Sequence, residues 1–186
     1  MGYRSGFHNT LGNRNVFIGN NAGFHNIGNG AFEGANNVFI GNRSGYDNDI
    51  GQSNVFIGEL SGTNNQNGRY NVFIGKNTGA SNVDGNFNVC IGSHSGTLQS
   101  GSNNIFIGYG AEPEEDVSNR LIIKNSINDD PLIEGKFDLD VVQINDVMRL
   151  KPRSTEPWNP EAGMIYYDST INKLKAFDGT SWHTLW

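Results

Sequence analysis

The sequence predicts an all-β protein, a parallel β-solenoid followed by a small β-meander, on the basis of three observations. Gly (25 residues) and Asn (28) fill more than a quarter of the 186 residues, and both are poor helix formers that tolerate positive φ. A pentapeptide recurs at nearly constant spacing through the first two thirds of the chain. The last third instead alternates apolar and polar residues in short runs between turn residues, which is typical of antiparallel strands.

The pentapeptide Asn-Val-Phe-Ile-Gly marks the repeat. It begins four times unchanged and twice with one substitution, at Asn15, Asn37, Asn54, Asn71, Asn88 and Asn104, with spacings of 22, 17, 17, 17 and 16 residues. Seventeen residues are too few for a strand, a helix and a return, so each unit is expected to be one solenoid coil of two or three short strands with Gly and Asn at its corners. The recurrent Asn side chains are expected to pair from coil to coil.

Each repeated strand is apolar on both faces, because the middle residue points to one side and its two neighbours to the other. A solitary coil would therefore expose one hydrophobic ladder to water. We expect the middle residues inside the coil and the flanking Val and Ile between three copies of the chain, although periodicity by itself leaves open which ladder faces inward. The coil-core candidates are Phe17, Phe39, Phe56, Phe73, Cys90 and Phe106. The trimer-interface candidates are Val38, Ile40, Val55, Ile57, Val72, Ile74, Ile105 and Ile107.

The chain is expected to have three parts. Residues 1–111 form the solenoid shaft, and their five acidic and five basic residues cancel, so the net charge of −6 comes from the remainder. Residues 112–148 begin with an acidic connector and continue with strands expected at 121–123, 132–133 and 141–144, a β-rich segment that would cap the solenoid edge. Residues 149–186 begin with a proline-rich lead-in, and strands expected at 164–167, 173–177 and 181–186 form the meander tip.

The sequence lacks the signatures of several classes of function. No basic stripe is present for nucleic acid, no apolar run of about 18 residues is present for membrane insertion, and no motif calls for a cofactor. The nearest carboxylate pairs, Asp129/Asp130 and Asp138/Asp140, lie in turn-like contexts and are interpreted as solvated acids, so we expect no enzyme activity. His8 and His25 occupy equivalent repeat positions and are expected to stack, but no metal-ligand spacing accompanies them.

Sugar binding is the candidate function that remains, because aromatic rings that also carry a polar group stack on pyranose rings. The C-terminal segment gathers five such residues, which are the receptor-binding candidates: Trp158, Tyr166, Tyr167, Trp182 and Trp186. The alternative interpretation places most of them in the core of a trimeric tip. Since neighbours on a strand alternate in direction, we expect at most one of Tyr166 and Tyr167 to be exposed.

The arrays of Asn-Val-Phe-Ile-Gly-Asn-x-x-Gly resemble the left-handed β-roll head repeats of trimeric autotransporter adhesins, and resemble still more the repeats of phage and phage-tail-like fibre proteins. Residues 118–135 are similar to the section that follows such arrays in fibres. The run from Gly163 to Thr170, with Asn172-Lys173-Leu174 and Asp178 to Trp182, resembles a common terminal motif of tail fibres.

The resemblance implies a homotrimeric fibre with a left-handed roll, located on a virion or an extracellular injection particle. It also implies attachment to a cell-surface glycan or receptor, and a link to a baseplate or tail protein through a preceding N-terminal part. The 17-residue unit is longer than the adhesin repeat, which leaves the cross-section of the coil open. The sequence ends at Trp186 with no membrane anchor, and on this ground we expect a fibre and not an outer-membrane adhesin. Two alternatives stay open: a purely structural fibre or adaptor of a contractile injection particle, and a polysaccharide-degrading tail spike or cell-surface adhesin.

Overall fold

The protein forms two compact units in a computed structural model that describes residues 1–30, 33–98 and 100–185. The first unit, Met1–Asn145, holds a nine-stranded sheet in the order β1 to β9, and the second, Asp146–Trp186, holds the three-stranded sheet β10–β11–β12. The described residues contain no helix. The all-β prediction is therefore confirmed. The unit boundary lies at Asn145, three residues before the end of the segment that the sequence assigned to residues 112–148.

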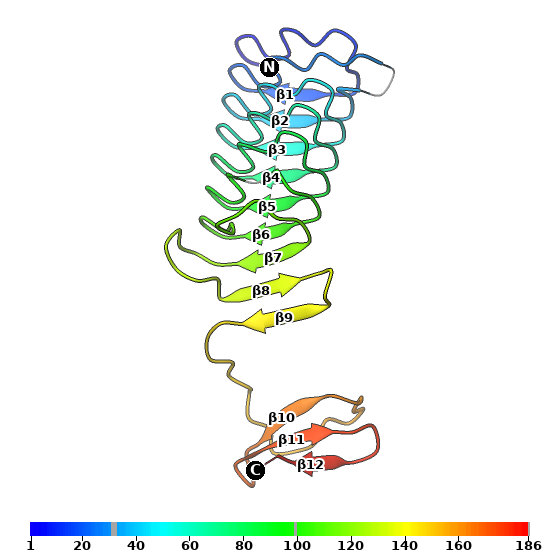
Figure 1. Cartoon of the computed structure of the whole chain (residues 1–186), viewed down its shortest axis with the longest axis vertical. Coiled ribbons are helices and arrows are strands. Elements are labelled where there is room, and N and C mark those ends of the chain that lie inside the picture. The colour runs from blue at the N-terminus through cyan, green and yellow to red at the C-terminus, as the bar shows by residue number, and fades with distance from the viewer. Residues whose placement is uncertain (31–32, 99, 186) are drawn as a thin grey trace. The chain divides into compact units, whose positions relative to one another are not determined.

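Seven strands of the first sheet run parallel, one in each coil of the solenoid (Figure 1). They are β1 (Val16–Ile18), β2 (Val38–Ile40), β3 (Val55–Ile57), β4 (Val72–Ile74), β5 (Val89–Ile91), β6 (Ile105–Ile107) and β7 (Arg120–Ile123). The register matches equivalent repeat residues, and the longer first spacing does not disturb it, since Phe17 pairs with Phe39. The predicted β-solenoid is thus confirmed. Strand β7 adds a rung beyond residue 111, where the repeat was predicted to end.

Each coil contains a single three-residue strand in most of the shaft, not the two or three strands that its length suggested. The other sides are turns that hydrogen-bond to the next coil, as where the Gly45 N–H donates to the Ser61 carbonyl (2.9 Å). Residues with positive φ recur in these turns, and each of them ends a stretch of extended backbone. At one of them, Gly62 (φ 57°), a Cβ would lie 2.5 Å from the ring of Phe56, so the corner requires glycine.

A ladder of phenylalanine rings fills the coils on one side. Phe39, Phe56, Phe73 and Phe106 are at most 1% exposed, and Cys90 is 2% exposed. Successive rings stack with centroids 4.9 Å apart between Phe39 and Phe56 and between Phe56 and Phe73. Phe17 packs against this cluster but is only partly buried, because β1 is the first strand of the sheet.

Two asparagine ladders fill the rest of the interior. In the first, which contains Asn71, the side-chain oxygen accepts the next rung's N–H and the amide donates to a glycine carbonyl of the following turn. In the second, the amide of Asn65 donates to Oδ1 of Asn48 (2.9 Å) and to the Gly68 carbonyl (3.0 Å). The predicted pairing of Asn side chains is therefore confirmed. These amides hydrogen-bond backbone groups that the coil interior shields from water.

Cys90 offers a direct test of this interior. Burial, and secondarily the charge of Glu112, raises the pKa of its thiol well above the ordinary value, so almost no thiolate is present at neutral pH. We expect a thiol reagent such as dithionitrobenzoate to leave the native protein unmodified and to react with one thiol per chain in denaturant. Because Cys90 is the only cysteine, any slow labelling in native buffer over longer times reports opening of the coil. Rapid labelling in native buffer would contradict the buried position.

Beyond β7 the sheet turns antiparallel. Strand β8 (Ile133–Lys136) pairs with β7, and β9 (Val141–Ile144) pairs with β8 and ends the sheet. The second unit is a meander of β10 (Ile165–Asp168), β11 (Lys173–Phe177) and β12 (Trp182–Thr184). The strands expected in residues 121–123, 141–144 and 173–177 are confirmed, and those expected at 132–133, 164–167 and 181–186 have shifted bounds.

Candidate functional site

The outer face of the solenoid sheet carries two unbroken aliphatic columns, which we call the outer aliphatic face. One column is Val16, Val38, Val55, Val72, Val89, Ile105 and Leu121, and the other is Ile18, Ile40, Ile57, Ile74, Ile91, Ile107 and Ile123. All eight trimer-interface candidates lie in it. Seven of them are partly buried and Ile107 is 38% exposed. No charged or polar side chain interrupts either column.

The β8–β9 hairpin adds more exposed apolar surface to the same sheet. All four residues of β9 are exposed, including Val142 at 67%. Leu132, Leu139 and Ile144 are also more than two fifths exposed. A largely apolar edge strand that is exposed on both faces has unpaired backbone groups that can template pairing with another chain.

In the second unit, Tyr166 lies inside and belongs to a polar network. Its hydroxyl donates to Oδ2 of Asp168 (3.2 Å), and Nζ of Lys175 lies 3.6 Å from the same oxygen and 2.8 Å from Oε1 of Glu156. Burial raises the pKa of Tyr166, hydrogen bonds from Thr170 lower the pKa of Asp168, and the hydrogen bond to Glu156 raises the pKa of Lys175. The network therefore keeps Asp168 and Lys175 ionised and fixes Tyr166 in place.

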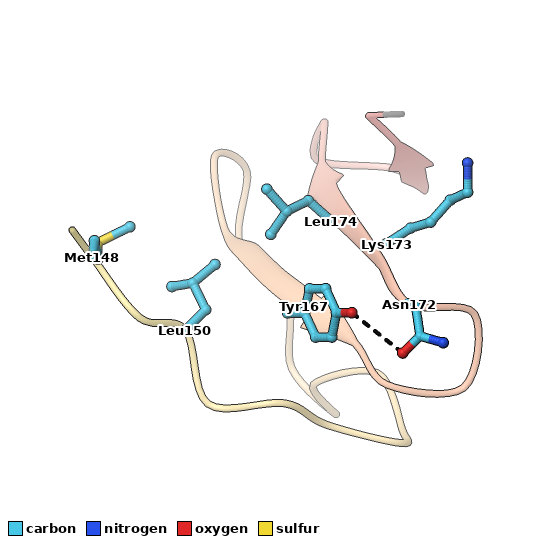
Figure 2. Close-up of a pocket in the computed structure, with 6 residues that line it drawn as sticks. All are labelled: Met148, Leu150, Tyr167, Asn172, Lys173 and Leu174. Atoms are coloured by element: carbon cyan, nitrogen blue, oxygen red, sulfur yellow. Dashed lines mark hydrogen bonds between the residues drawn. The ribbon is translucent and has the colours of Figure 1, made fainter.

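Tyr167 points to the opposite side of β10, into a cavity of about 330 Å³ (Figure 2). Met148, Leu150 and Leu174 supply its apolar lining, and the Tyr167 hydroxyl donates to Oδ1 of Asn172 (3.2 Å). Figure 2 shows the Lys173 side chain extending away from the tyrosine ring. This arrangement suits an apolar contact with one oriented polar group, which is typical of small-ligand sites.

The structure separates the other receptor-binding candidates. Trp158 is 97% exposed. Trp182 packs edge-on against Tyr166 with ring centroids 4.8 Å apart and also contacts Phe177, so it is part of the core of this unit. Trp186 lies outside the described residues. Trp158 and Tyr167 are thus the candidates that offer surface to a ligand, while Tyr166 and Trp182 hold the meander together.

The carboxylates and histidines singled out by the sequence do not gather into a reactive site. Asp129 and Asp130 are exposed, and Asp138 lies 3.8 Å from a guanidinium nitrogen of Arg120. Asp140, at a left-handed corner (φ 53°), is exposed as well. Across residues 1–30, 33–98 and 100–185, no group of three or more His, Cys, Asp or Glu side chains is arranged to hold a metal ion.

His8 and His25 stack as their repeat positions predicted, with ring centroids 5.3 Å apart. His25 also places Nδ1 2.7 Å from Oδ1 of Asp47, which comes from the next coil. The rings of Phe24 and Tyr46 stack beside this pair with centroids 5.1 Å apart. These contacts join three successive coils along one corner of the shaft, and they are structural.

A Ser-His-Asp group formed by the turn after β11 and by strand β12 was not found by sequence reasoning. Oδ2 of Asp178 lies 2.6 Å from Nε2 of His183, and Oγ of Ser181 lies 3.1 Å from the same nitrogen. A nucleophilic triad needs the acid and the hydroxyl on different ring nitrogens, so this group is no triad. The run Asp-Gly-Thr-Ser is the sequence signal, since Asp side chains hydrogen-bond the backbone of such turns.

Asp178 predicts how this turn responds to acid. The N–H groups of Ser181 and Thr180, followed by His183, lower the pKa of its carboxyl from the usual 3.8 to about 2. Because the folded pKa is depressed, the stabilisation is complete above about pH 4 and is lost as the pH falls through 2. We expect the amide resonances of Thr180 and Ser181 to titrate with a midpoint near 2, and Asp178→Asn to abolish that titration. A midpoint near 4 would contradict these contacts.

The part of the chain that the structure describes forms no apolar helix of membrane-spanning length. No protein-family model, curated protein or solved structure matches the chain, so no relative supplies a function for it.

Proposed function

We propose that this chain is a segment of a homotrimeric tail fibre or related receptor-binding fibre, and that it attaches to a target-cell surface through its C-terminal unit. The outer aliphatic face carries the proposal. Two continuous columns of Val, Ile and Leu over seven strands present a larger apolar stripe than monomeric proteins usually leave in water. The exposed hairpin β8–β9 extends that apolar surface on the same sheet.

The partner that fits this face best is the chain itself. Every coil places its Val and Ile at the same positions, and parallel strands are spaced about 4.8 Å apart, so a second copy presents a matching row at the same period. Three copies around an axis cover one face of each chain more completely than two copies do. The second unit has about 40 residues, which is small for independent stability, and trimerisation would support it as well.

Attachment then works through multivalency. A trimeric fibre presents three C-terminal units together, so weak binding by each is strengthened by the high effective concentration of the others. Trp158 and Tyr167 are the candidate contacts, because Trp158 is almost fully exposed and Tyr167 lines a cavity. No catalytic step is proposed, since the described carboxylates are solvated or paired.

Light scattering on the purified full chain tests the assembly, and the expected mass is about three times the chain mass of 20.3 kDa. A well-folded monomer would overturn the proposal. The labelled protein is then mixed with intact cells of candidate hosts. Saturable attachment supports the receptor-binding role, whereas a trimer without attachment identifies a structural fibre or adaptor. Release of reducing ends from capsule or lipopolysaccharide would instead identify a polysaccharide-degrading spike.

A further inference from the structure

We infer that the C-terminal unit binds an acidic saccharide, a pyranose that carries a carboxylate, in a second cavity between the lead-in segment and β10. This inference rests on the proposed function, names a ligand class for it and adds a binding site apart from Trp158 and Tyr167, in which one side of the core residue Tyr166 forms part of the wall. The cavity has a volume of about 370 Å³ and is lined by Leu150, Lys151, Arg153, Pro157, Met164, Ile165 and Tyr166. That volume lies in the range of about 300–1,000 Å³ that small-ligand sites occupy.

The cavity has a built wall. The Arg153 N–H donates to the Tyr167 carbonyl (3.0 Å), and the Ser169 N–H donates to the Arg153 carbonyl (2.8 Å). The lead-in therefore runs beside β10 as a short parallel bridge between Arg153 and Asp168. Because the backbone is fixed at this point, Arg153 projects from a defined position and not from a free loop.

Two cations line this cavity without an acidic partner. Among the described residues, neither Lys151 nor Arg153 forms an ion pair, and both are exposed. Two carboxylates of this unit are engaged elsewhere. Glu156 pairs with Lys175 (2.8 Å), and Asp168 accepts hydrogen bonds from the hydroxyl (2.6 Å) and the N–H (2.9 Å) of Thr170. No carboxylate lines the cavity, so an incoming anion meets no competing acid among the lining residues. The guanidinium of Arg153 matches a carboxylate with two parallel hydrogen bonds.

The remaining lining is apolar, with Leu150, Pro157, Met164 and Ile165 beside Tyr166. The ring of Tyr166 is held by its hydroxyl and by Trp182, so this wall is rigid. A ligand that fills the cavity needs an apolar side for this wall and an anion for the two cations. A uronic acid has both, because the C–H face of its ring is apolar and its carboxylate projects from the ring edge. A nucleic acid would require a longer basic stripe.

Titration calorimetry on the full chain tests the inference with uronate trisaccharides (galacturonate, glucuronate and mannuronate) and with their methyl esters. Each ester group lacks the negative charge of the carboxylate and carries one added methyl group. We expect at least one uronate to bind and its ester to bind about tenfold more weakly or worse, since charged hydrogen bonds are lost. We expect Lys151→Gln/Arg153→Gln to lower the affinity for the acid by about the same factor and to leave the ester unaffected. Arg149→Gln is the matched control for the single variant Arg153→Gln, because each removes one positive charge from the same lead-in and Arg149 lies outside the cavity.

The outcomes separate this inference from the proposed function. If the chain is trimeric and attaches to cells but binds none of the uronates, or binds acid and ester equally, the inference is wrong and the fibre stands. Equal loss of affinity in Arg149→Gln would mean general charge attraction and would also overturn the site. A trimer that neither attaches nor binds overturns both the attachment role and this inference. If a tri-aspartate peptide binds as tightly as the best uronate, the ligand class is wrong.

Discussion

Asn71→Asp is expected to destabilise the solenoid strongly at neutral pH and much less in acid. Asn71 is 0% exposed. Its amide donates to the Gly85 carbonyl (2.7 Å) and its oxygen accepts the Asn88 N–H (2.9 Å). An aspartate has the same shape and still accepts the hydrogen bond from the Asn88 N–H. Its second carboxylate oxygen, however, faces the Gly85 carbonyl oxygen in the buried interior, where the two oxygens repel each other. We expect a loss of about 3 kcal/mol or more in the free energy of unfolding.

The pH dependence of this variant has a defined sign. Burial beside a carbonyl raises the folded pKa of the new carboxyl above its ordinary value of about 3.9. Below that value the protonated carboxyl donates to the Gly85 carbonyl as the amide does, and as the pH rises through the raised pKa this stabilisation is lost. Denaturant unfolding of wild type and variant at pH 3.5 and pH 7, followed by circular dichroism, measures the difference.

Asn64→Asp is the matched control for Asn71→Asp. Asn64 is exposed in the preceding turn, and Asp47 already occupies the equivalent position one coil earlier. We expect this control to change the free energy of unfolding by about 0.5 kcal/mol or less at either pH. If Asn71→Asp unfolds like the control, the asparagine ladder contributes far less to stability than its hydrogen bonds indicate.

Ile57→Asp is expected to abolish assembly while each chain keeps its fold. Ile57 lies on the outer aliphatic face, partly exposed in the single chain, so a carboxylate there stays hydrated in a monomer. In the proposed trimer three such charges would be buried close to one axis, and burying unpaired like charges costs about 3–5 kcal/mol or more for each. Light scattering should then report a monomer whose circular dichroism matches that of the wild type.

Two further variants sharpen this test. Ile57→Val keeps the surface apolar and should stay trimeric, and Asn64→Asp adds the same charge to another side of the same coil without dispersing the trimer. An Ile57→Asp protein of wild-type size would show that the outer aliphatic face is not the assembly interface. In that case the hairpin β8–β9 would be the next apolar surface to test, starting from Val142→Asp.

Some features of the candidate sites followed from local patterns and others did not. Alternation predicts that Tyr166 and Tyr167 point apart, but not which of them is buried. That depends on Trp182 and Lys175, which arrive from β12 and β11. Likewise, Lys151 and Arg153 look like ordinary surface charges in the sequence. Only the bridge between the lead-in and β10 places them in one cavity.

The corners of the solenoid also have features that local sequence patterns do not predict. Tyr70 and Phe87 have φ of 59° and 58°, a conformation that bulky side chains rarely adopt. Nothing about a tyrosine or a phenylalanine in the sequence predicts a positive φ. The backbone is held there by bonds between coils, as where the Tyr70 N–H donates to the Gln52 carbonyl (3.1 Å), and the two exposed rings stack 5.0 Å apart.

The sequence by itself determined the coil period, the position of the repeated strand and the pairing of like residues between coils. These follow from the repeat, because a shift of one residue would place each Phe beside a Val or Ile of the next coil and bring Asn or Gly into the apolar ladders. Only the tertiary structure decided that the phenylalanines face inward. The coil interior must accommodate their rings against glycine corners such as Gly62, which carries no Cβ, while it satisfies the buried amides of the asparagine ladders. Those constraints arise from atoms one coil apart, which periodicity along the chain does not describe.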